Sequence, residues 1–153
     1  MVKLKRAYDP VSRTDGIRLL VERLWPRGLS KEKLKLDGWI REVGPTTELR
    51  KWFGHDPAKW SQFRNRYFRE LDSRPESWQQ IASLSRGRTV TLVYSSHDEE
   101  HNNAVALREY LQVKARRPVR RRLIRRSQSR YLRAASSSPR LASERLGRNS
   151  SAF

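Results

Sequence analysis

The sequence contains no cysteine, which excludes disulfide bonds, thiolate metal ligands and thiol nucleophiles. It has no apolar run of about 18 residues or more, so no membrane-spanning helix is predicted. The first residues, MVKLKRAYDP, lack the apolar stretch of a secretory signal. Glycine-rich phosphate loops, nucleophile elbows and Cys/His patterns are also missing, so we predict no resident metal or cofactor. Together these absences favour a cytoplasmic protein that does not enter a membrane.

Acidic residues are almost absent from the C-terminal part of the chain. Residues 114–153, called the tail below, hold 13 of the 34 Lys and Arg residues, 12 of them Arg, and a single acid, Glu144. The tail therefore supplies about two thirds of the net charge of +18. Its Arg/Ser-rich composition buries too little apolar surface to offset the entropy cost of ordering, so we predict that it is disordered.

Residues 1–113, called the body below, mix acids and bases and contain all five tryptophans. About 113 residues are enough for one modest hydrophobic core. The body has a net charge of +6, which is too mild to require a nucleic-acid partner. The sequence does not decide the oligomeric state.

Apolar patterns predict a small α/β domain. Alternation over 2–8 predicts a half-buried edge strand, and the apolar runs over 17–24 and 89–94 predict buried strands. Helical spacing and capping signals predict helices between the strands. Three are predicted over 31–35, 36–43 and 78–84. Two more are predicted to begin at Thr46 or Thr47 and at Asp56-Pro57. A final helix is predicted from Ser96. Two strands separated by helices favour a right-handed parallel crossover, so we expect at least three strands, at least one parallel pair and helices on the faces of the sheet.

The first candidate site follows the expected central strand. Arg23, Trp25 and Arg27 lie in RLWPRG, where open α/β sheets collect ligands beyond the carboxyl ends of their strands. Two arginines and a tryptophan can hold a phosphate or carboxylate and stack on a ring. The alternative is that Trp25 closes the end of the core while Arg23 pairs with an acid such as Asp37 or Glu48.

The second candidate, SSHDEEHNN at 95–103, follows the other buried strand. His97 and His101 would share a helix face, which invites a zinc interpretation, but a metalloprotease box needs Glu where Asp98 stands and no third ligand is evident. The alternatives are a polar site that uses Ser95, His101 or Asn102, or a capping box in which Ser96 and Glu99 start the helix.

The third candidate is ELRKWFGHD at 48–56, which contains Arg50 and Trp52. His55 is a candidate general acid or base near neutral pH, and Asp56 a candidate to orient it. The alternative is that Asp56 only caps the next helix.

These segments resemble the YeaO-like branch of domain-of-unknown-function family 488, a group of small bacterial proteins. The resemblance runs from about Lys3 to Leu111 and rests on the blocks KRAYDP, DGIRLLVERLWPRGLSKEKL, LDGWIREVGPTTELRKWFGHDPAKW, FRNRYFREL and TLVYSSHDEEHNNAVALREYL. It brings no established activity with it. It implies that the family's shared motifs include Arg23, Trp25, Arg27, Arg50, Trp52, Phe53, His55, Asp56, Ser95, His101 and Asn102.

The tail departs from that resemblance, because family members usually end soon after the position of Leu111. Its composition is the one expected when a GC-rich gene is read in a shifted frame. Our hypothesis is that residues 114–153 are a frameshift product or a recent extension, which resequencing of the gene tests.

Three functions remain open at this point. The body is expected to bind a small anionic ligand, such as a nucleotide or phosphorylated metabolite, at the carboxyl ends of its strands, and the sequence does not decide whether it is an enzyme. The alternative is a nucleic-acid-binding protein whose affinity comes mainly from the tail without sequence preference. A third hypothesis is a protein-interaction domain with an aromatic surface. The candidate catalytic residues are His55, Asp56 and His101, and the candidate ligand-binding residues are Arg23, Trp25, Arg27, Arg50, Trp52, Ser95 and Asn102.

Overall fold

The structure, a computed structural model, describes residues 1–117. The strands are β1 (Val2–Arg6), β2 (Ile17–Leu20), β3 (Gly38–Trp39) and β4 (Val90–Tyr94). The α-helices are α1 (Lys31–Leu34), α2 (Thr47–Phe53), α3 (Trp60–Ser73), α4 (Pro75–Ser85) and α5 (Asn103–Ala115). Three short 3-10 helices are η1 (Arg13–Asp15), η2 (Arg41–Val43) and η3 (Pro57–Lys59). The predicted disorder of the tail falls almost entirely outside the described residues.

The four strands form one parallel sheet in the order β1-β4-β2-β3. The predicted α/β class and parallel pairing are confirmed, and β1 is an edge strand as expected. β4 lies between β1 and β2, with Leu92 opposite Leu4 on one side and Leu19 on the other. The carboxyl ends of all four strands therefore meet at one edge of the sheet.

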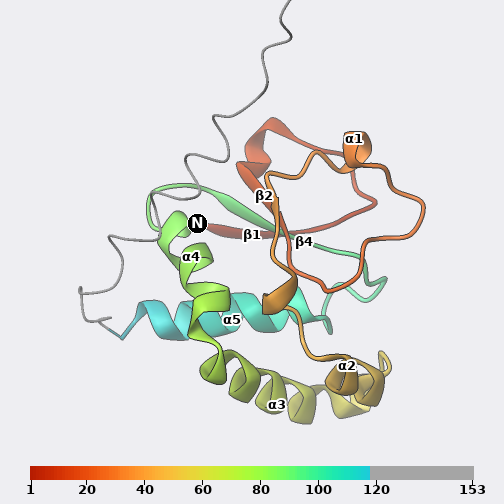
Figure 1. Ribbon diagram of the computed structural model, residues 1–153, viewed down its shortest axis with the longest axis vertical. Helices are drawn as coiled ribbons and strands as arrows, with labels where there is room; N and C mark the ends of the chain where they lie inside the picture. Colours follow the sequence, from red (N-terminus) through yellow and green to blue (C-terminus); the bar gives the residue numbers. More distant parts are fainter. Residues whose placement is uncertain (118–153) are drawn as a thin grey trace, which may run out of the picture. The chain divides into compact units, whose positions relative to one another are not determined.

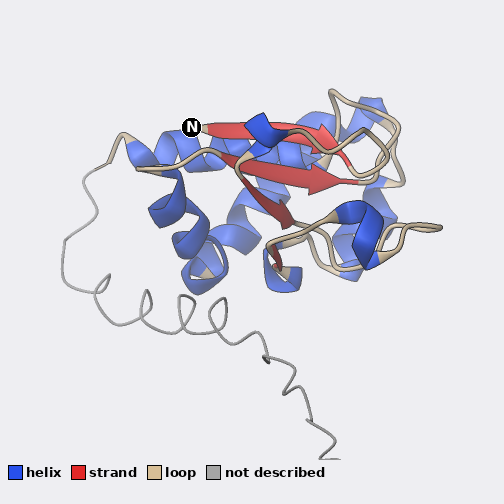
Figure 2. Cartoon of the chain, turned by 90° about the horizontal axis from the view of Figure 1, so that it is seen from above, coloured by secondary structure: helices blue, strands red, loops and turns tan. Residues whose placement is uncertain are grey.

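Helices α2 to α5 cover one face of the sheet, whereas α1 and its flanking loops lie over the other (Figures 1 and 2). Side chains alternate along each strand, so Leu19 and Leu92 join the core under the helices while Leu20 and Val93 join a smaller cluster on the second face. The larger core contains one face of α3, with Phe63, Tyr67 and Leu71 buried among the helices.

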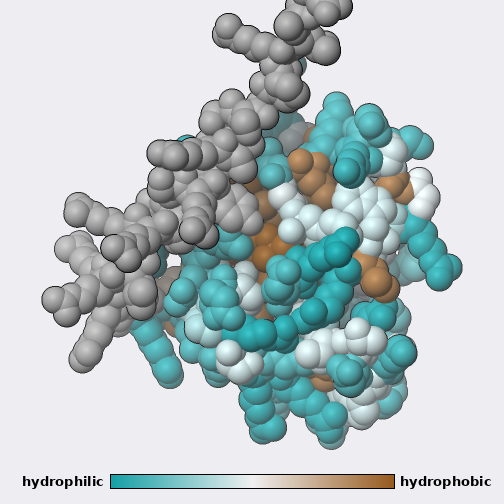
Figure 3. All heavy atoms as spheres, in the orientation of Figure 1, coloured by the Kyte–Doolittle hydropathy of each residue, from teal (hydrophilic) through white to brown (hydrophobic). Residues whose placement is uncertain are grey.

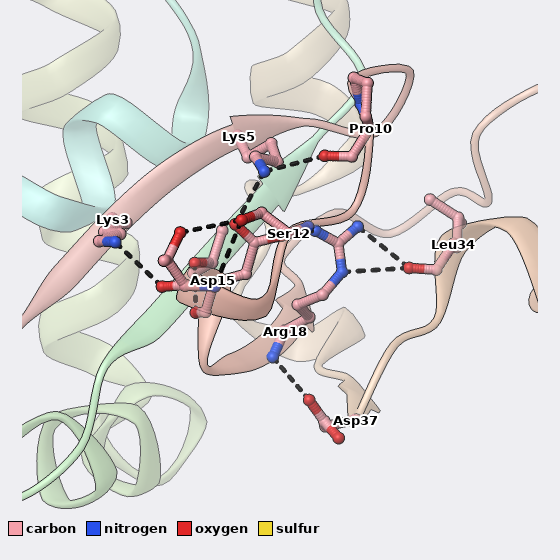
Figure 4. A network of polar contacts seen from close by, with 10 residues as sticks. Lys3, Lys5, Pro10, Ser12, Asp15, Arg18, Leu34 and Asp37 are labelled. Atoms are coloured by element: carbon pink, nitrogen blue, oxygen red, sulfur yellow. Dashed lines mark hydrogen bonds and ion pairs between the residues drawn. The ribbon is translucent and has the colours of Figure 1, made fainter.

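A buried polar network holds the second face together (Figure 4). The carboxylate of Asp15, which is 3% exposed, accepts from Lys5 Nζ and Arg18 Nη1, each at 2.7 Å. The Arg18 guanidinium also donates to the Leu34 carbonyl from Nε at 3.1 Å and Nη2 at 3.0 Å. Two ion pairs that share the Asp15 carboxylate, with the Arg18 bonds to Leu34, therefore tie β1, β2 and the end of α1 together.

The expected helix over 36–43 is wrong. The chain runs there as β3 and then η2, because backbone hydrogen bonds join it to β2: Ile40 N–H donates to the Leu20 carbonyl at 2.9 Å. The indole of Trp39 donates to the Glu22 carbonyl at 2.6 Å. Pairing with a strand distant in sequence overrides the helical spacing.

In the part of the chain that the structure describes, no helix is long and apolar enough to cross a membrane. Large hydrophobic side chains that are clearly exposed are few, and the visible face in Figure 3 shows scattered brown patches among hydrophilic residues.

Candidate functional site

Two polar side chains meet where β2 and β4 end. Glu22 follows β2 and Ser95 follows β4 directly. Glu22 accepts the Ser95 N–H on Oε1 at 2.9 Å and the Ser95 hydroxyl on Oε2 at 2.7 Å. This pair bridges the carboxyl ends of two neighbouring parallel strands, the position at which open α/β sheets bind ligands.

Burial raises the pKa of Glu22 above its ordinary value. The two hydrogen bonds from Ser95 and the charges of His55 and Arg50 act in the opposite direction but do not outweigh the loss of solvent. The Glu22 carboxyl therefore holds its proton more tightly than a solvated glutamate does. The charges of Arg50 and His55 act on the Glu22 carboxyl, and these two residues, Glu22 and Ser95 are called the Glu22 cluster below.

Helix α2 carries Arg50, and His55 follows in the loop at its C-terminal end. Thr46 caps its start by accepting the Leu49 N–H at 3.3 Å, and Gly54 ends it in the left-handed region with φ 53°. His55 is also left-handed, with φ 56°, a conformation that costs a non-glycine residue about 1–2 kcal/mol. Its ring centroid lies 6.4 Å from that of Phe53.

The side chains of Arg50 and His55 are exposed. Among the described residues neither makes a side-chain hydrogen bond or ion pair, so their donors are available to a ligand.

His101 lies near the other end of the same aromatic group. Its Nδ1 pairs with Asp98 Oδ2 at 2.9 Å, and its ring meets Trp60 edge-on with centroids 5.4 Å apart. Trp60 in turn lies 6.0 Å from Phe53, centroid to centroid. His55 and His101 therefore flank one aromatic group, but one nitrogen of His101 is already engaged.

The final helix does not begin at Ser96, so the predicted capping box is wrong. α5 begins at Asn103, and Asn102 is its N-cap, accepting the Val105 N–H on Oδ1 at 3.0 Å. Asn102 Nδ2 also donates to the Asp98 carbonyl at 2.9 Å, so both ends of this buried amide serve the fold.

His97 and His101 accordingly do not share a helix face. His97 Nδ1 lies 3.2 Å from Arg6 Nη2, away from the His101–Asp98 pair. The described residues contain no group of three or more His, Asp or Glu side chains arranged to hold a metal ion.

Arg23 has a backbone role. Its Nε donates to the carbonyls of Gly44 at 3.2 Å and Pro45 at 2.9 Å. The expected alternative partners do not contact it: Asp37 accepts the Arg18 N–H at 2.8 Å, and Glu48 is exposed on α2. Arg23 thus fixes the loop before α2.

The remaining candidates lie outside the Glu22 cluster. Trp25 donates to the Leu29 carbonyl at 2.6 Å and packs edge-on against Trp39, with centroids 5.3 Å apart, in the cluster on the second face. Arg27 is exposed in that same loop, and its carbonyl accepts the Tyr8 hydroxyl at 2.9 Å. Asp56 caps η3 by accepting the Ala58 N–H at 3.0 Å.

Trp52 lines a shallow hollow of about 440 Å³ between α2 and α3. The guanidinium carbon of Arg66 lies 4.1 Å from its ring centroid, and Lys59 Nζ lies 5.1 Å from it. A second open hollow, of about 660 Å³, lies at the amino ends of the strands. Neither hollow is lined by the Glu22 cluster.

Sequence reasoning missed Glu22, the centre of the cluster. It was included in the strand expected over 17–24, whereas β2 ends at Leu20. A single carboxylate at the end of an apolar run, just before Trp-Pro-Arg-Gly, was the signal that could have identified it.

The model of the DUF488-N3i family, described as "Inactive DUF488-N3 subclade", matches residues 1–131. The chain belongs to this family. The resemblance to YeaO-like proteins is thereby confirmed. Over 110 residues the chain is 39% identical to "Uncharacterized protein YeaO" of Escherichia coli (strain K12), which covers 72% of this chain and 96% of YeaO.

The chain is similarly 31% identical over 110 residues to "Uncharacterized protein Rv3073c" of Mycobacterium tuberculosis (strain ATCC 25618 / H37Rv), covering 72% of this chain and 92% of that protein. No solved structure gave a significant match. Both relatives are bacterial, and together they leave more than a quarter of this chain without a counterpart.

Proposed function

We propose that the body binds a small anionic ligand, a nucleotide or another phosphorylated metabolite, at the carboxyl edge of β2 and β4. The observation that carries this proposal is the Glu22 cluster. The ends of β2 and β4 bring a carboxylate and a hydroxyl into contact, and the charges of Arg50 and His55, on and just after α2, act on that carboxylate.

Each member of the cluster has a distinct part in such a complex. The Arg50 guanidinium forms charge-assisted hydrogen bonds with phosphate or carboxylate oxygens, and His55 adds a further donor. Glu22 keeps lone pairs that can accept from a ligand hydroxyl, as an acid at this edge does for a ribose in dinucleotide-binding folds. Ser95, held by Glu22 at 2.7 Å, has its hydroxyl oriented before the ligand arrives.

The arrangement favours binding over catalysis. A general base requires a partner that orients it, but Asp56 caps η3 and makes no hydrogen bond with His55. His101 has such a partner in Asp98, but it lies outside the Glu22 cluster, across the Phe53–Trp60 contact from His55. The word "Inactive" in the family description supports the same choice.

We also propose that the protein acts in the cytoplasm, where nucleotides and phosphorylated metabolites are found. The strongly basic residues 114–153 provide the alternative function, sequence-independent nucleic-acid binding, for the part of the chain that follows the body.

The ligand proposal is tested with Arg50→Gln in the full chain. Isothermal titration with AMP, ATP and ribose 5-phosphate first identifies a probe that the wild type binds. We expect Arg50→Gln to weaken its binding roughly 10- to 100-fold, the loss of one hydrogen bond to a charged group.

Lys51→Gln is the matched control, because it removes the same charge from the next residue of α2, which is exposed, and it should bind like the wild type. Equal affinities of the wild type and Arg50→Gln would show that the site is elsewhere. Binding of none of the three probes would also contradict the proposal.

A further inference from the structure

The hollow at the amino ends of the strands is the other place where functional groups gather. It has a volume of about 660 Å³ and is lined by residues from the starts of β1 and β2, from η1 and from the loop before β4. It therefore lies at the edge of the sheet opposite to the Glu22 cluster.

The lining of this hollow is cationic. Lys3, Arg13 and Arg88 contribute positive side chains, whereas no acidic side chain lines it. Arg13 and Arg88 are exposed, and their guanidinium groups make no hydrogen bond or ion pair within residues 1–117. The nearby carboxylate of Asp15 is buried and engaged by Lys5 and Arg18 (Figure 4), so it does not serve as their counterion.

The floor of the hollow is rigid backbone. Gly16 has φ 65°, and a Cβ placed there would lie 2.2 Å from the Thr89 carbonyl oxygen, so the two backbones pack directly on each other. Ile17 N–H donates to that same carbonyl at 2.9 Å. Lys3 Nζ is held by the Thr14 carbonyl at 2.9 Å. The cations are thus carried by fixed elements, which reduces the entropy cost of binding.

The shape of the hollow favours a polyanion over a small molecule. Small-molecule sites enclose most of the ligand between apolar or aromatic walls, whereas this hollow is open and no aromatic side chain lines it. Open cationic surfaces with free guanidinium groups suit the phosphates of a nucleic-acid backbone.

The C-terminal end of α5 lies on the same side of the body as the N-terminus (Figures 1 and 2). The chain therefore leaves α5 at Arg116 and Arg117 on the side of the molecule that carries the hollow.

We propose that this hollow binds the phosphodiester backbone of nucleic acid without reading its bases, and that Arg13 and Arg88 are its principal contacts. The body then contributes an anchoring surface of its own, independent of the charge of the tail and of the ligand proposed for the Glu22 cluster.

The test uses the untagged full-length chain and a fluorescent 20-base-pair DNA duplex of arbitrary sequence. Anisotropy titrations between 50 and 200 mM salt give the affinity and its salt dependence. The double variant Arg13→Gln, Arg88→Gln should lower the slope of log K against log salt by about 2, because each phosphate contact contributes about 0.9. Its affinity at 100 mM salt should fall roughly 10-fold or more.

The matched control is Lys31→Gln, Lys33→Gln, which removes two exposed charges from α1 without touching the hollow. Its slope should change by less than half as much. Equal changes in the two double variants, or none in either, would refute the hollow as a binding surface.

Inorganic tripolyphosphate distinguishes a small phosphate ligand from a nucleic acid. If the arginine variant loses tripolyphosphate binding while its DNA affinity and salt slope stay at the wild-type values, the nucleic-acid proposal is wrong. Circular dichroism and the thermal midpoint of each variant establish that the comparison is made between folded proteins.

Discussion

Asp15 and Glu22, which lie before and after β2, have pKa values shifted in opposite directions although burial raises both. Burial raises the pKa of Asp15, but hydrogen bonds from Lys5, the Ser12 N–H and Arg18 outweigh it, so the pKa lies below its ordinary value. Glu22 is held only by the neutral donors of Ser95, and its pKa stays above its ordinary value. The two pKa shifts differ because a cation contacts only one of the carboxylates: Lys5 Nζ and Arg18 Nη1 each lie 2.7 Å from an Asp15 carboxylate oxygen.

Asp15→Asn should destabilise the protein strongly. It removes the counterion of Arg18, whose side chain is 3% exposed, and breaking a buried ion pair from one side costs about 3–5 kcal/mol. Urea unfolding at pH 7 measures the change. Asp56→Asn is the control, because Asp56 is exposed and asparagine caps helices as well as aspartate does. Similar losses in both variants would show that the network on the second face adds no stability.

Glu22 should make the stability depend on pH. Because its folded-state pKa is raised above 4.5, the folded protein binds a proton more tightly than the unfolded chain. The free energy of unfolding should therefore decrease as pH rises from 4.5 through the folded-state pKa. Glu22→Gln should flatten this part of the profile, as measured by urea unfolding at several pH values. Glu48→Gln, at an exposed position of α2, should keep the wild-type slope, and a slope that survives Glu22→Gln would assign the effect to another group.

Helix starts mark the limit of what local sequence determines. Asp56-Pro57 and Thr46 were expected at helix starts and do cap η3 and α2. Ser96 and Glu99 fit the capping-box pattern of a helix start. The chain after β4 nevertheless forms a loop, in which Asp98 accepts the N–H groups of Glu100 and His101. Several residues in a row could have started that helix; the helix begins after Asn102, where the side chain of Asn103 donates to the Val21 carbonyl at 2.7 Å.

Asn102→Ala should therefore cost more stability than Ser96→Ala. The alanine removes the side-chain acceptor for the Val105 N–H and the bond to the Asp98 carbonyl, and loss of an N-cap costs about 1 kcal/mol. Ser96 Oγ accepts only the Asp98 N–H, at 3.2 Å, within the described residues. Thermal unfolding of both variants measures the two losses of stability. A larger loss of stability in Ser96→Ala would show that Ser96, and not Asn102, stabilises the start of α5.

Long-range pairing explains the rest of what sequence could not supply. The parallel α/β sheet followed from apolar runs separated by helices, because those patterns depend on neighbours in the chain. The two residues of β3 carry no such pattern: Gly38 and Trp39 became a strand by pairing with Leu19 and Leu20. The Glu22–Ser95 contact likewise depends on the placement of β4 beside β2, because Ser95 lies 73 positions after Glu22 in the sequence.

At the scale of the molecule, β4 is the most protected part of the fold. All five of its residues are buried, and it pairs on both sides. In native-state hydrogen exchange its amides should exchange slowest and only through global unfolding, whereas β1, which is partly exposed at an edge, should exchange faster. Slower exchange in β1 than in β4 would contradict the strand order.

The charge of the whole chain describes the body poorly. About two thirds of the +18 belongs to residues 114–153, while the body places free cations at both edges of its sheet, Arg50 at one and Arg13 and Arg88 at the other. The two proposals therefore concern opposite edges and can fail independently.

The position of β4 between β1 and β2 has a consequence for synthesis. β1 and β2 are made first, but neither pairs with the other, and their common partner begins only at Val90. Until β4 is made, β1 has no strand to pair with, and β2 can pair only with the two residues of β3. Such delayed non-local pairing slows folding and exposes intermediates to aggregation. Ribosome-bound chains that end before residue 90 should thus be the species that most need a chaperone.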